Sequence, residues 1–165
     1  MKKLTLVPVV LLFTGIALAQ NGAIILVRHA EKESQSMTSD VPLSAIGRAR
    51  AQCLAHTLRS SHVTGVIVSD LQRTRQTTEP LLAANHLTPM VIPARDTQRA
   101  VQEARKLAAG GNVLIVGHSD TLPAMLSLLG FPGIKIPDDA YDEMFIVVPG
   151  ENPSLLELRY CPAEK

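Results

Sequence analysis

The chain has 165 residues, of which 46% are hydrophobic and 19% are charged, and its formal net charge is +1. This composition is typical of a globular domain with a buried core, and it excludes a disordered or low-complexity chain. Basic residues number 16 and acidic residues 15. Lys2 and Lys3 lie in a segment that we expect to be removed, which leaves 14 basic residues against 15 acidic ones. Because basic residues are then not in excess, we expect no nucleic-acid partner.

The first residues have the pattern of a secretory signal peptide. Two lysines precede an apolar stretch from Leu4 to Leu18, and Ala17-Leu18-Ala19 supplies the small residues of a cleavage site. The stretch is shorter than the roughly 20 apolar residues of a membrane-spanning helix. We therefore expect a signal peptide over residues 1–19, a single domain over residues 20–165, and a periplasmic or secreted protein with no stable membrane insertion after cleavage.

The chain has two cysteines, Cys53 and Cys161. Neither has a second cysteine nearby, which argues against a zinc site. Export would allow a disulfide to persist. The distance between the two residues cannot be read from the sequence, so two separate thiols and one disulfide both fit.

Strands and helices alternate along the predicted domain. Apolar runs predict strands, and apolar positions at helical spacing predict helices. This alternation predicts an α/β fold, a three-layer α/β/α sandwich with a largely parallel central sheet. The predicted strands are Ala23–Val27, Val63–Val68, Pro89–Ile92, Val113–Val116, Met144–Val148 and Leu155–Tyr160, and the predicted helices are Ser44–Leu58, Leu71–Ala84, Thr97–Ala109 and Thr121–Leu129.

Polar residues follow three of these strands directly. They are Arg28-His29 after the first strand, Ser69 to Arg73 after the second, and His118-Ser119 after the fourth. The carboxyl ends of parallel strands meet at one edge of a sheet, where ligands gather. The sequence therefore predicts that two imidazoles and two guanidinium groups surround one ligand.

This set of side chains suits a phosphoryl group. The planar fork of arginine binds phosphate oxygens in pairs and stays charged, which fits Arg28 and Arg73. A neutral imidazole with one ring nitrogen held by a hydrogen bond can attack phosphorus with the other. His29 follows a buried strand, where its backbone is rigid, so we assign attack to it. His118 precedes a helix start, so we expect it to stabilise phosphate oxygens.

Four segments resemble motifs of the histidine phosphatase superfamily, also called the phosphoglycerate mutase-like family. Arg28-His29-Ala30 resembles its Arg-His-Gly signature, and Gly117-His118-Ser119 its distal Gly-His-Ser. Ser69 to Thr74 resembles its Ser-x-Leu-x-Arg-Thr element, and Leu43 to Arg48 the element that opens its first helix. The resemblance spans about Ala23 to Tyr160.

The resemblance implies a phosphoglycerate mutase-like fold and a phosphatase that acts on phosphomonoesters of small molecules or proteins. His29 would form a phosphohistidine, and Arg28, Arg73 and His118 would complete the phosphate pocket, with no cofactor and no metal. We also place Ser119 and Glu31 among the substrate contacts.

The chain departs from the family pattern at two places. Ala30 replaces glycine, which we expect to be tolerated unless the backbone needs a positive φ. Asp120 lies one residue beyond the aspartate that follows the distal histidine in the acid phosphatase branch, so we expect it to cap the next helix instead.

For the general acid that protonates the leaving group we favour Asp96, after the third strand, with Glu31, Asp120 and Asp142 as alternatives. Asp96 also fits a simple helix cap.

Two other classes of function remain open. One is a non-catalytic phosphoanion-binding protein that has lost its acid. The other is a metal-dependent hydrolase that uses His29, Glu31, His118 and Asp120 as ligands. Two arginines in the same pocket would repel a divalent cation, so we favour a metal-independent enzyme. A mutase is less expected than a phosphatase, because residues 74–117 have no room for a long insertion over the site.

Overall fold

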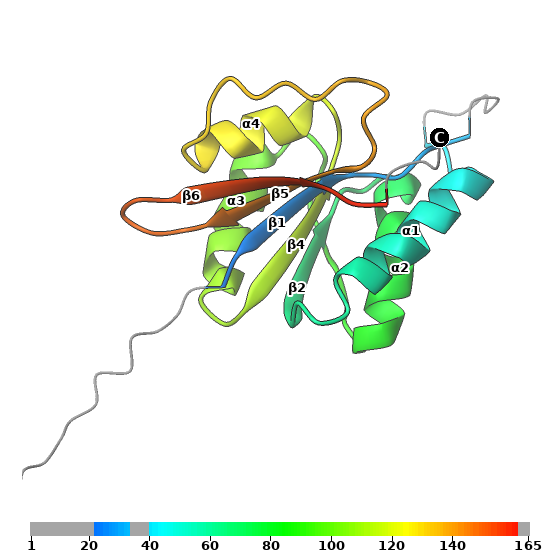
Figure 1. Ribbon diagram of the computed structural model, residues 1–165, viewed down its shortest axis with the longest axis horizontal. Helices are drawn as coiled ribbons and strands as arrows, with labels where there is room; N and C mark the ends of the chain where they lie inside the picture. Colours follow the sequence, from blue (N-terminus) through cyan, green and yellow to red (C-terminus); the bar gives the residue numbers. More distant parts are fainter. Residues whose placement is uncertain (1–21, 34–39, 162–165) are drawn as a thin grey trace, which may run out of the picture.

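The computed structural model describes residues 22–33 and 40–161 (Figure 1). The predicted signal peptide lies outside the described residues. Within them, no helix is long and apolar enough to cross a membrane.

One six-stranded sheet forms the centre of the molecule, with the strand order β3-β2-β4-β1-β5-β6. The strands β3, β2, β4 and β1 run parallel, and β5 and β6 continue the sheet as an antiparallel hairpin. The predicted α/β fold with a largely parallel sheet is therefore confirmed. The strands are β1 (Ile24–Arg28), β2 (Val63–Val68), β3 (Met90–Val91), β4 (Asn112–Gly117), β5 (Glu143–Val148) and β6 (Ser154–Arg159).

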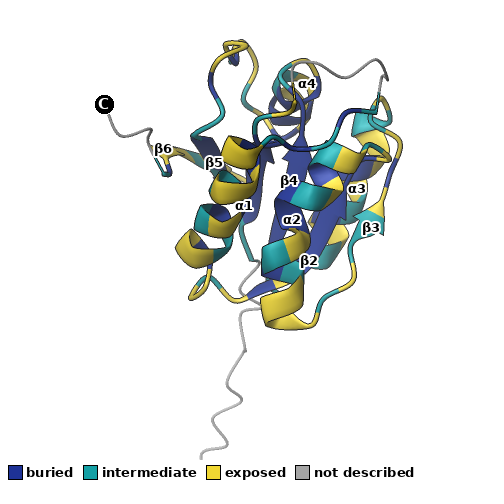
Figure 2. Ribbon diagram, turned by 90° about the vertical axis from the view of Figure 1, so that its right-hand side faces the viewer, coloured by how far each residue is buried: buried dark blue, intermediate teal, exposed yellow. Residues whose placement is uncertain are grey.

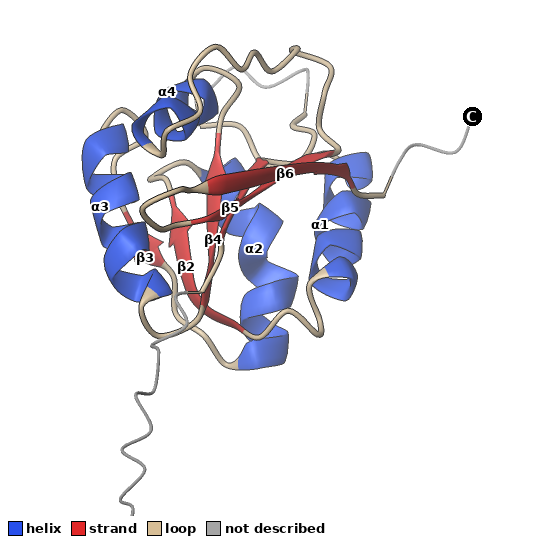
Figure 3. Cartoon of the chain, turned by 60° about the vertical axis from the view of Figure 1, so that its left-hand side comes forward, coloured by secondary structure: helices blue, strands red, loops and turns tan. Residues whose placement is uncertain are grey.

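Helices cover both faces of the sheet, which gives the three layers that the sequence predicts (Figure 3). The helices are α1 (Ala45–Thr57), α2 (Gln72–Asn85), α3 (Thr97–Ala108) and α4 (Thr121–Leu128). Successive residues of β1 point to opposite faces. Ile24 and Leu26 therefore join the core under α3 and α4, and Ile25 and Val27 join the core under α1 and α2. Figure 2 shows the central strands as a buried layer behind α1 and α2.

The two cysteines form a disulfide. Cys53 on α1 is bonded to Cys161, just beyond β6, with a Cα–Cα distance of 6.2 Å and 108 residues between them in sequence. The residue just beyond the edge strand β6 is thus covalently bonded to α1. Of the two interpretations that the sequence left open, the structure has the disulfide.

Candidate active site

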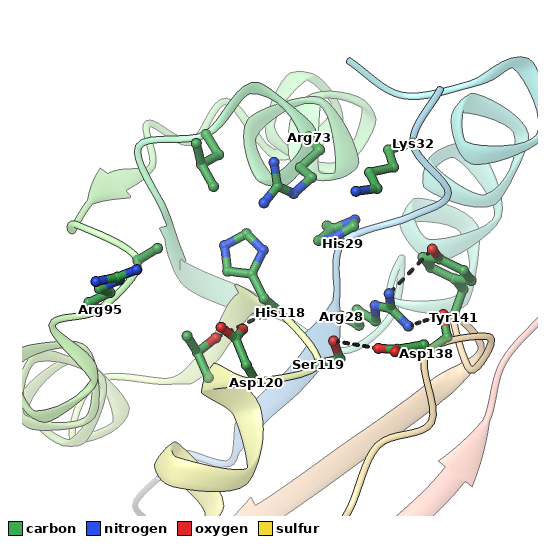
Figure 4. A pocket seen from close by; sticks show the side chains of 13 residues that line it. Arg28, His29, Lys32, Arg73, Arg95, His118, Ser119, Asp120, Asp138 and Tyr141 are labelled. Carbon is green, nitrogen blue, oxygen red and sulfur yellow. Dashed lines mark hydrogen bonds between the residues drawn. The ribbon is translucent and has the colours of Figure 1, made fainter. Parts of the chain in front are cut away.

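A cavity of about 630 Å³ lies at the carboxyl ends of β1, β2 and β4. The two histidines and two arginines that the sequence predicts line it together, and Figure 4 shows His29 and His118 beside the same space, with Arg73 on one side and Arg28 on the other. The full lining is Arg28, His29, Lys32, Leu71, Arg73, Ala94, Arg95, His118, Ser119, Asp120, Thr121, Asp138 and Tyr141.

His29 is held by backbone groups on both sides. Its backbone N–H donates to the carbonyl of Gly117 at 2.9 Å, which continues the β1–β4 pairing past the end of the strand. Its Nδ1 lies 2.8 Å from the carbonyl oxygen of Ala30. Because a carbonyl only accepts, Nδ1 carries the proton. The lone pair of Nε2 is therefore the free one, as a nucleophile requires.

The environment keeps this imidazole neutral. Burial lowers the pKa of His29 most strongly, the hydrogen bond to Ala30 raises it, and the nearby His118, Arg73 and Arg28 lower it; the resulting pKa is about 3. A charged imidazolium would lie 4% exposed between two guanidinium groups, without the solvation that it needs. His29 is therefore unprotonated, with its lone pair available, over the whole physiological pH range.

Ala30 fits the position of the family's glycine without strain. The non-glycine residues with positive φ among those described are His62, His86 and Cys161, so Ala30 has an ordinary backbone conformation. It is fully buried, and its N–H donates to Thr77 Oγ1 at 2.9 Å. The substitution leaves the turn after β1 intact.

His118 is joined to the β2–α2 segment by a side-chain hydrogen bond. Its Nε2 lies 3.1 Å from Ser69 Oγ, which in turn lies 2.9 Å from Thr74 Oγ1. Its ring centroid is 5.2 Å from that of His29. Burial, and after it the charge of Arg73, lower the pKa of His118 to about 4. The remaining nitrogen, Nδ1, is buried and has no hydrogen-bond partner among the described residues.

Arg28 is bound to the loop that precedes β5. Its Nη1 donates to the carbonyls of Pro137, Asp138 and Ala140 at 3.1, 2.7 and 3.4 Å. Its Nη2 donates to Tyr141 Oη at 3.3 Å, and the guanidinium carbon lies 4.0 Å from the centre of the Tyr141 ring. The Nε–H is buried without a partner among the described residues. The loop thus anchors the Nη groups of Arg28 at the cavity that this residue lines.

Arg73 reaches the cavity from the first turn of α2. It is partly buried, and desolvation lowers its pKa while the carboxylates of Asp40 and Asp120 raise it. Guanidinium stays charged under all physiological conditions. Arg28 and Arg73 therefore supply two fixed positive charges on either side of a neutral nucleophile.

The carboxylates lie differently from the prediction. Asp96 is the N-cap of α3, where its Oδ1 accepts from the backbone N–H of Arg99 at 3.2 Å, and it does not line the cavity. Glu31 does not line it either, because its carboxylate is bound to Arg50 on α1. The structure therefore does not bring Asp96 and Glu31 into the lining of the cavity, and their predicted roles stay predictions.

Asp120 and Asp138 are the carboxylates that line the cavity within the described residues. Asp120 occupies the N-cap position of α4, but its side chain makes no capping hydrogen bond, so the predicted capping role is wrong. Instead its charge acts on both Arg73 and His118. Asp138 Oδ1 accepts from Ser119 Oγ at 3.2 Å, which places the predicted contact Ser119 in the lining. Asp142 pairs with Arg159 away from the site.

Sequence reasoning missed Lys32, Arg95 and Asp138 as lining residues. All three are exposed charged residues in loops, so nothing in their local pattern separates them from ordinary surface residues. The described residues include no group of three or more histidine, cysteine or acidic side chains placed to hold a metal ion.

Comparison with known proteins adds evidence from outside the chain. Residues 24–95 match the histidine phosphatase superfamily, branch 1. The segment that carries His29 and Arg73 is similar to this superfamily. The matched segment stops before His118.

One curated relative is similar to part of the chain. The chain is 35% identical over 91 residues to a probable phosphoglycerate mutase GpmB from Yersinia enterocolitica, a match that covers 51% of this chain and 42% of the relative. The chain thus matches less than half the length of that curated relative.

Solved structures of phosphatases share the fold. The protein histidine phosphatase SixA, complexed with tungstate, superimposes with a TM-score of 0.71 at 20% identity, over 86% of this chain and 99% of SixA. The α-ribazole phosphatase from Shigella flexneri gives a TM-score of 0.61 at 18% identity, over 83% of this chain and 96% of that phosphatase. At these identities the comparison shows the phosphoglycerate mutase-like fold.

Proposed function

We propose that this protein is a metal-independent phosphatase that hydrolyses phosphomonoesters through a phosphohistidine on His29. The observation that carries the proposal is the hydrogen bond from His29 Nδ1 to the Ala30 carbonyl, which directs a neutral Nε2 lone pair into a cavity with two guanidinium groups. The lining has four basic and two acidic side chains, so it attracts an anion.

The reaction follows from these positions in two displacements. First, the Nε2 lone pair of His29 attacks phosphorus, and the bond from phosphorus to the leaving oxygen breaks. Arg28 and Arg73 stabilise the charge on the equatorial oxygens of the transferred group. His118 lies beside His29 and contacts the same group. Second, water attacks the phosphohistidine, the P–N bond breaks, and inorganic phosphate leaves with His29 restored.

We assign the proton transfers to Asp120. A departing alkoxide needs a proton, and the attacking water must lose one. Asp120 lines the cavity with no capping hydrogen bond to occupy it, whereas the carboxylates of Asp96, Glu31 and Asp142 are engaged elsewhere. Asp138 accepts from Ser119. Asp120 is thus the better-placed acid for the first step and base for the second.

Hydrolysis fits this chain better than a mutase reaction. Between Arg73 and His118 the chain forms only the rest of α2, β3, α3 and β4, with no inserted segment over the cavity. The lining residues Lys32, Arg95 and Asp120 are exposed, so water reaches the phosphoenzyme. A mutase must exclude that water.

We also propose that the protein works outside the cytoplasm. The Cys53–Cys161 disulfide supports this, since disulfides persist in oxidising compartments. Mass spectrometry of the protein recovered from the periplasm or medium tests it, with a mature chain starting at Gln20 as the expected result. A protein that keeps residues 1–19 would contradict it.

The decisive experiment is trapping of the intermediate. Wild-type protein mixed with a ³²P-labelled aryl phosphate and quenched in base is expected to carry label that acid removes, as phosphohistidine does. His29→Ala is expected to carry no label and to show no turnover while its circular dichroism is unchanged. His86→Ala, at an exposed histidine, serves as the matched control. Label or more than a trace of turnover in His29→Ala would refute the proposal.

Two results would favour the alternative functions. Phosphate binding with no label and no turnover in the wild type would indicate a non-catalytic phosphoanion-binding protein. Activity that a chelator removes and a divalent cation restores would indicate a metal-dependent hydrolase. The substrate is then sought by screening phosphorylated metabolites and phosphoproteins, including phosphohistidine proteins, against mature protein.

A further inference from the structure

The backbone that follows His29 is fixed from α1. The carbonyl of Glu31 accepts from Ser44 N at 2.9 Å and from Ser44 Oγ at 3.2 Å. A Cβ atom on Gly47 would collide with the same carbonyl, so glycine allows the first turn of α1 to pack directly on this segment. The position of Glu31, two residues beyond the proposed nucleophile, is therefore set by α1.

Arg50 extends this contact by one turn of the helix. Its Nε lies 2.9 Å from both carboxylate oxygens of Glu31, and its Nη2 lies 2.6 Å from Oε1. The side chains of Arg50 and Glu31 are only 10% and 20% exposed. A partly buried, forked pair of this kind restricts both side chains in orientation as well as distance. Arg50 therefore fixes the side chain of Glu31, for which the sequence had suggested a substrate contact, outside the lining of the cavity.

The third contact of Arg50 is with the end of the described chain. Its Nη1 donates to the carbonyl of Cys161 at 2.9 Å. Cys161 has a φ of 49°, a left-handed conformation that a non-glycine residue keeps only where contacts hold it. The disulfide to Cys53, three residues after Arg50 on α1, supplies that hold. The disulfide thus keeps the Cys161 carbonyl in front of Arg50.

We infer that Arg50 is a positioning residue for His29, and that the Cys53–Cys161 disulfide keeps it in place, so that a thiol reductant slows phosphoryl transfer. The inference rests on the proposed function. Reduction by dithiothreitol gives two thiols on the protein and one cyclic disulfide of the reductant. Cys161 is then released, and Arg50 loses one of its two fixed partners. Both cysteines are partly exposed, so the reductant reaches them.

The first test separates positioning from binding. Stopped-flow release of 4-nitrophenol from 4-nitrophenyl phosphate gives the rate of transfer to His29, and calorimetry gives the Kd of inorganic phosphate. Because small displacements of a nucleophile are costly, Arg50→Ala is expected to lower the transfer rate by about tenfold or more and to leave the Kd within about twofold. Arg50→Lys is expected to lie between Arg50→Ala and wild type.

Arg59→Ala is the control, since this arginine is exposed and lies just beyond α1. It is expected to match wild type in both measurements. An unchanged transfer rate in Arg50→Ala would overturn the inference. A loss of rate, phosphate affinity and melting temperature together would also overturn it, because that pattern indicates a purely structural role.

The second test concerns the disulfide. Dithiothreitol is expected to lower the transfer rate of wild type about threefold or more, to the rate of Cys53→Ser/Cys161→Ser, which the reductant leaves unchanged. A reduced wild type as fast as the oxidised one would refute the role of the disulfide.

A third readout does not depend on turnover. The His29 Nδ1 proton, held by the Ala30 carbonyl, is expected to exchange with solvent faster by NMR in Arg50→Ala and in the reduced protein. An unchanged exchange rate would overturn the inference. The exchange rate of the His29 Nδ1 proton can rise in Arg50→Ala and on reduction while the wild type forms no phosphohistidine. In that case the proposed function fails while the positioning role of Arg50 stands.

Discussion

The cavity has two walls that are built differently. One wall consists of the ends of the parallel strands, where His29 donates to the Gly117 carbonyl and His118 contacts Ser69. The other is the loop over residues 137–141, where backbone carbonyls hold Arg28. The first wall relies on side chains of particular chemistry at particular positions. The second relies on the path of the backbone.

This difference explains how each wall tolerates change. A side chain in the strand-end wall has a chemical role that no neighbour replaces. Every residue type has a backbone carbonyl, so substitutions in the loop wall can leave the carbonyl contacts to Arg28 in place. Tyr141 adds a side-chain contact to Arg28. Substitutions in the strand-end wall should therefore have larger effects than those in the loop wall.

After the complete loss of turnover expected for His29→Ala, the largest effect is expected at Arg73. Removal of a fixed charge that stabilises the transferred group typically costs about 10²–10³-fold in rate. Arg73→Ala is expected to lower kcat/KM for 4-nitrophenyl phosphate by that amount. Arg75→Ala, at an exposed arginine of the same helix, provides the control. Equal activities of the two variants would show that Arg73 does not contact the phosphoryl group.

The next effect, at Asp120, depends on the leaving group. General acid catalysis contributes about 10²–10⁴-fold when the leaving group is a poor one. Asp120→Asn is expected to slow hydrolysis of ethyl phosphate by about 10²-fold, and that of 4-nitrophenyl phosphate far less. Asp96→Asn keeps a residue that caps α3 well, so both rates and the melting temperature should stay at wild-type values. A selective loss in Asp96→Asn instead would return the acid role to Asp96.

A smaller effect is expected in the loop wall. Tyr141→Phe removes one hydrogen bond to Arg28 and keeps the ring beneath it. A neutral partner of this kind contributes about 0.5–1.5 kcal/mol, so we expect a loss of phosphate affinity of about two- to tenfold. Calorimetric titration with inorganic phosphate measures it. A loss as large as that of Arg73→Ala would mean that the two walls contribute equally.

The smallest effect concerns the response of stability to pH. The pKa values of His29 and His118 are lowered by burial to about 3 and about 4, whereas an unfolded histidine titrates near 6.5. Between these values the unfolded chain binds more protons, so the free energy of unfolding falls as the pH drops below about 6.5. Urea unfolding at pH 7.5 and 5 should show a smaller fall in His118→Gln than in wild type. His86→Gln should behave as wild type.

The sequence predicted the strand-end wall well, because its chemistry is local. Arg28-His29 and His118 each follow an apolar run that ends at the sheet edge, and the parallel topology brings them together. The loop wall gave no such signal, since backbone carbonyls have no sequence pattern. The sequence also left the disulfide undecided, because its formation depends on the distance between two residues 108 positions apart in the chain.

The general acid could not be chosen from the sequence because two aspartates precede two helices. Asp96 before α3 and Asp120 before α4 have the same local pattern, and either could cap its helix. The structure gives the capping bond to Asp96 and leaves Asp120 in the cavity. Tertiary packing, which decides where each helix start points, is the information that a local pattern lacks.

The Cys53–Cys161 bond makes residues 53–161 a closed ring, and β1 lies on the segment before this ring. A protease that cuts once inside this ring opens it without separating the pieces. Protein nicked in the loop over residues 129–142 should therefore migrate as a single species in electrophoresis without reductant and as two fragments with it. Arg28 and His29 lie on the segment before the ring, so a cut between residue 29 and α1 gives a fragment with His29 that denaturing electrophoresis separates even while the disulfide is intact.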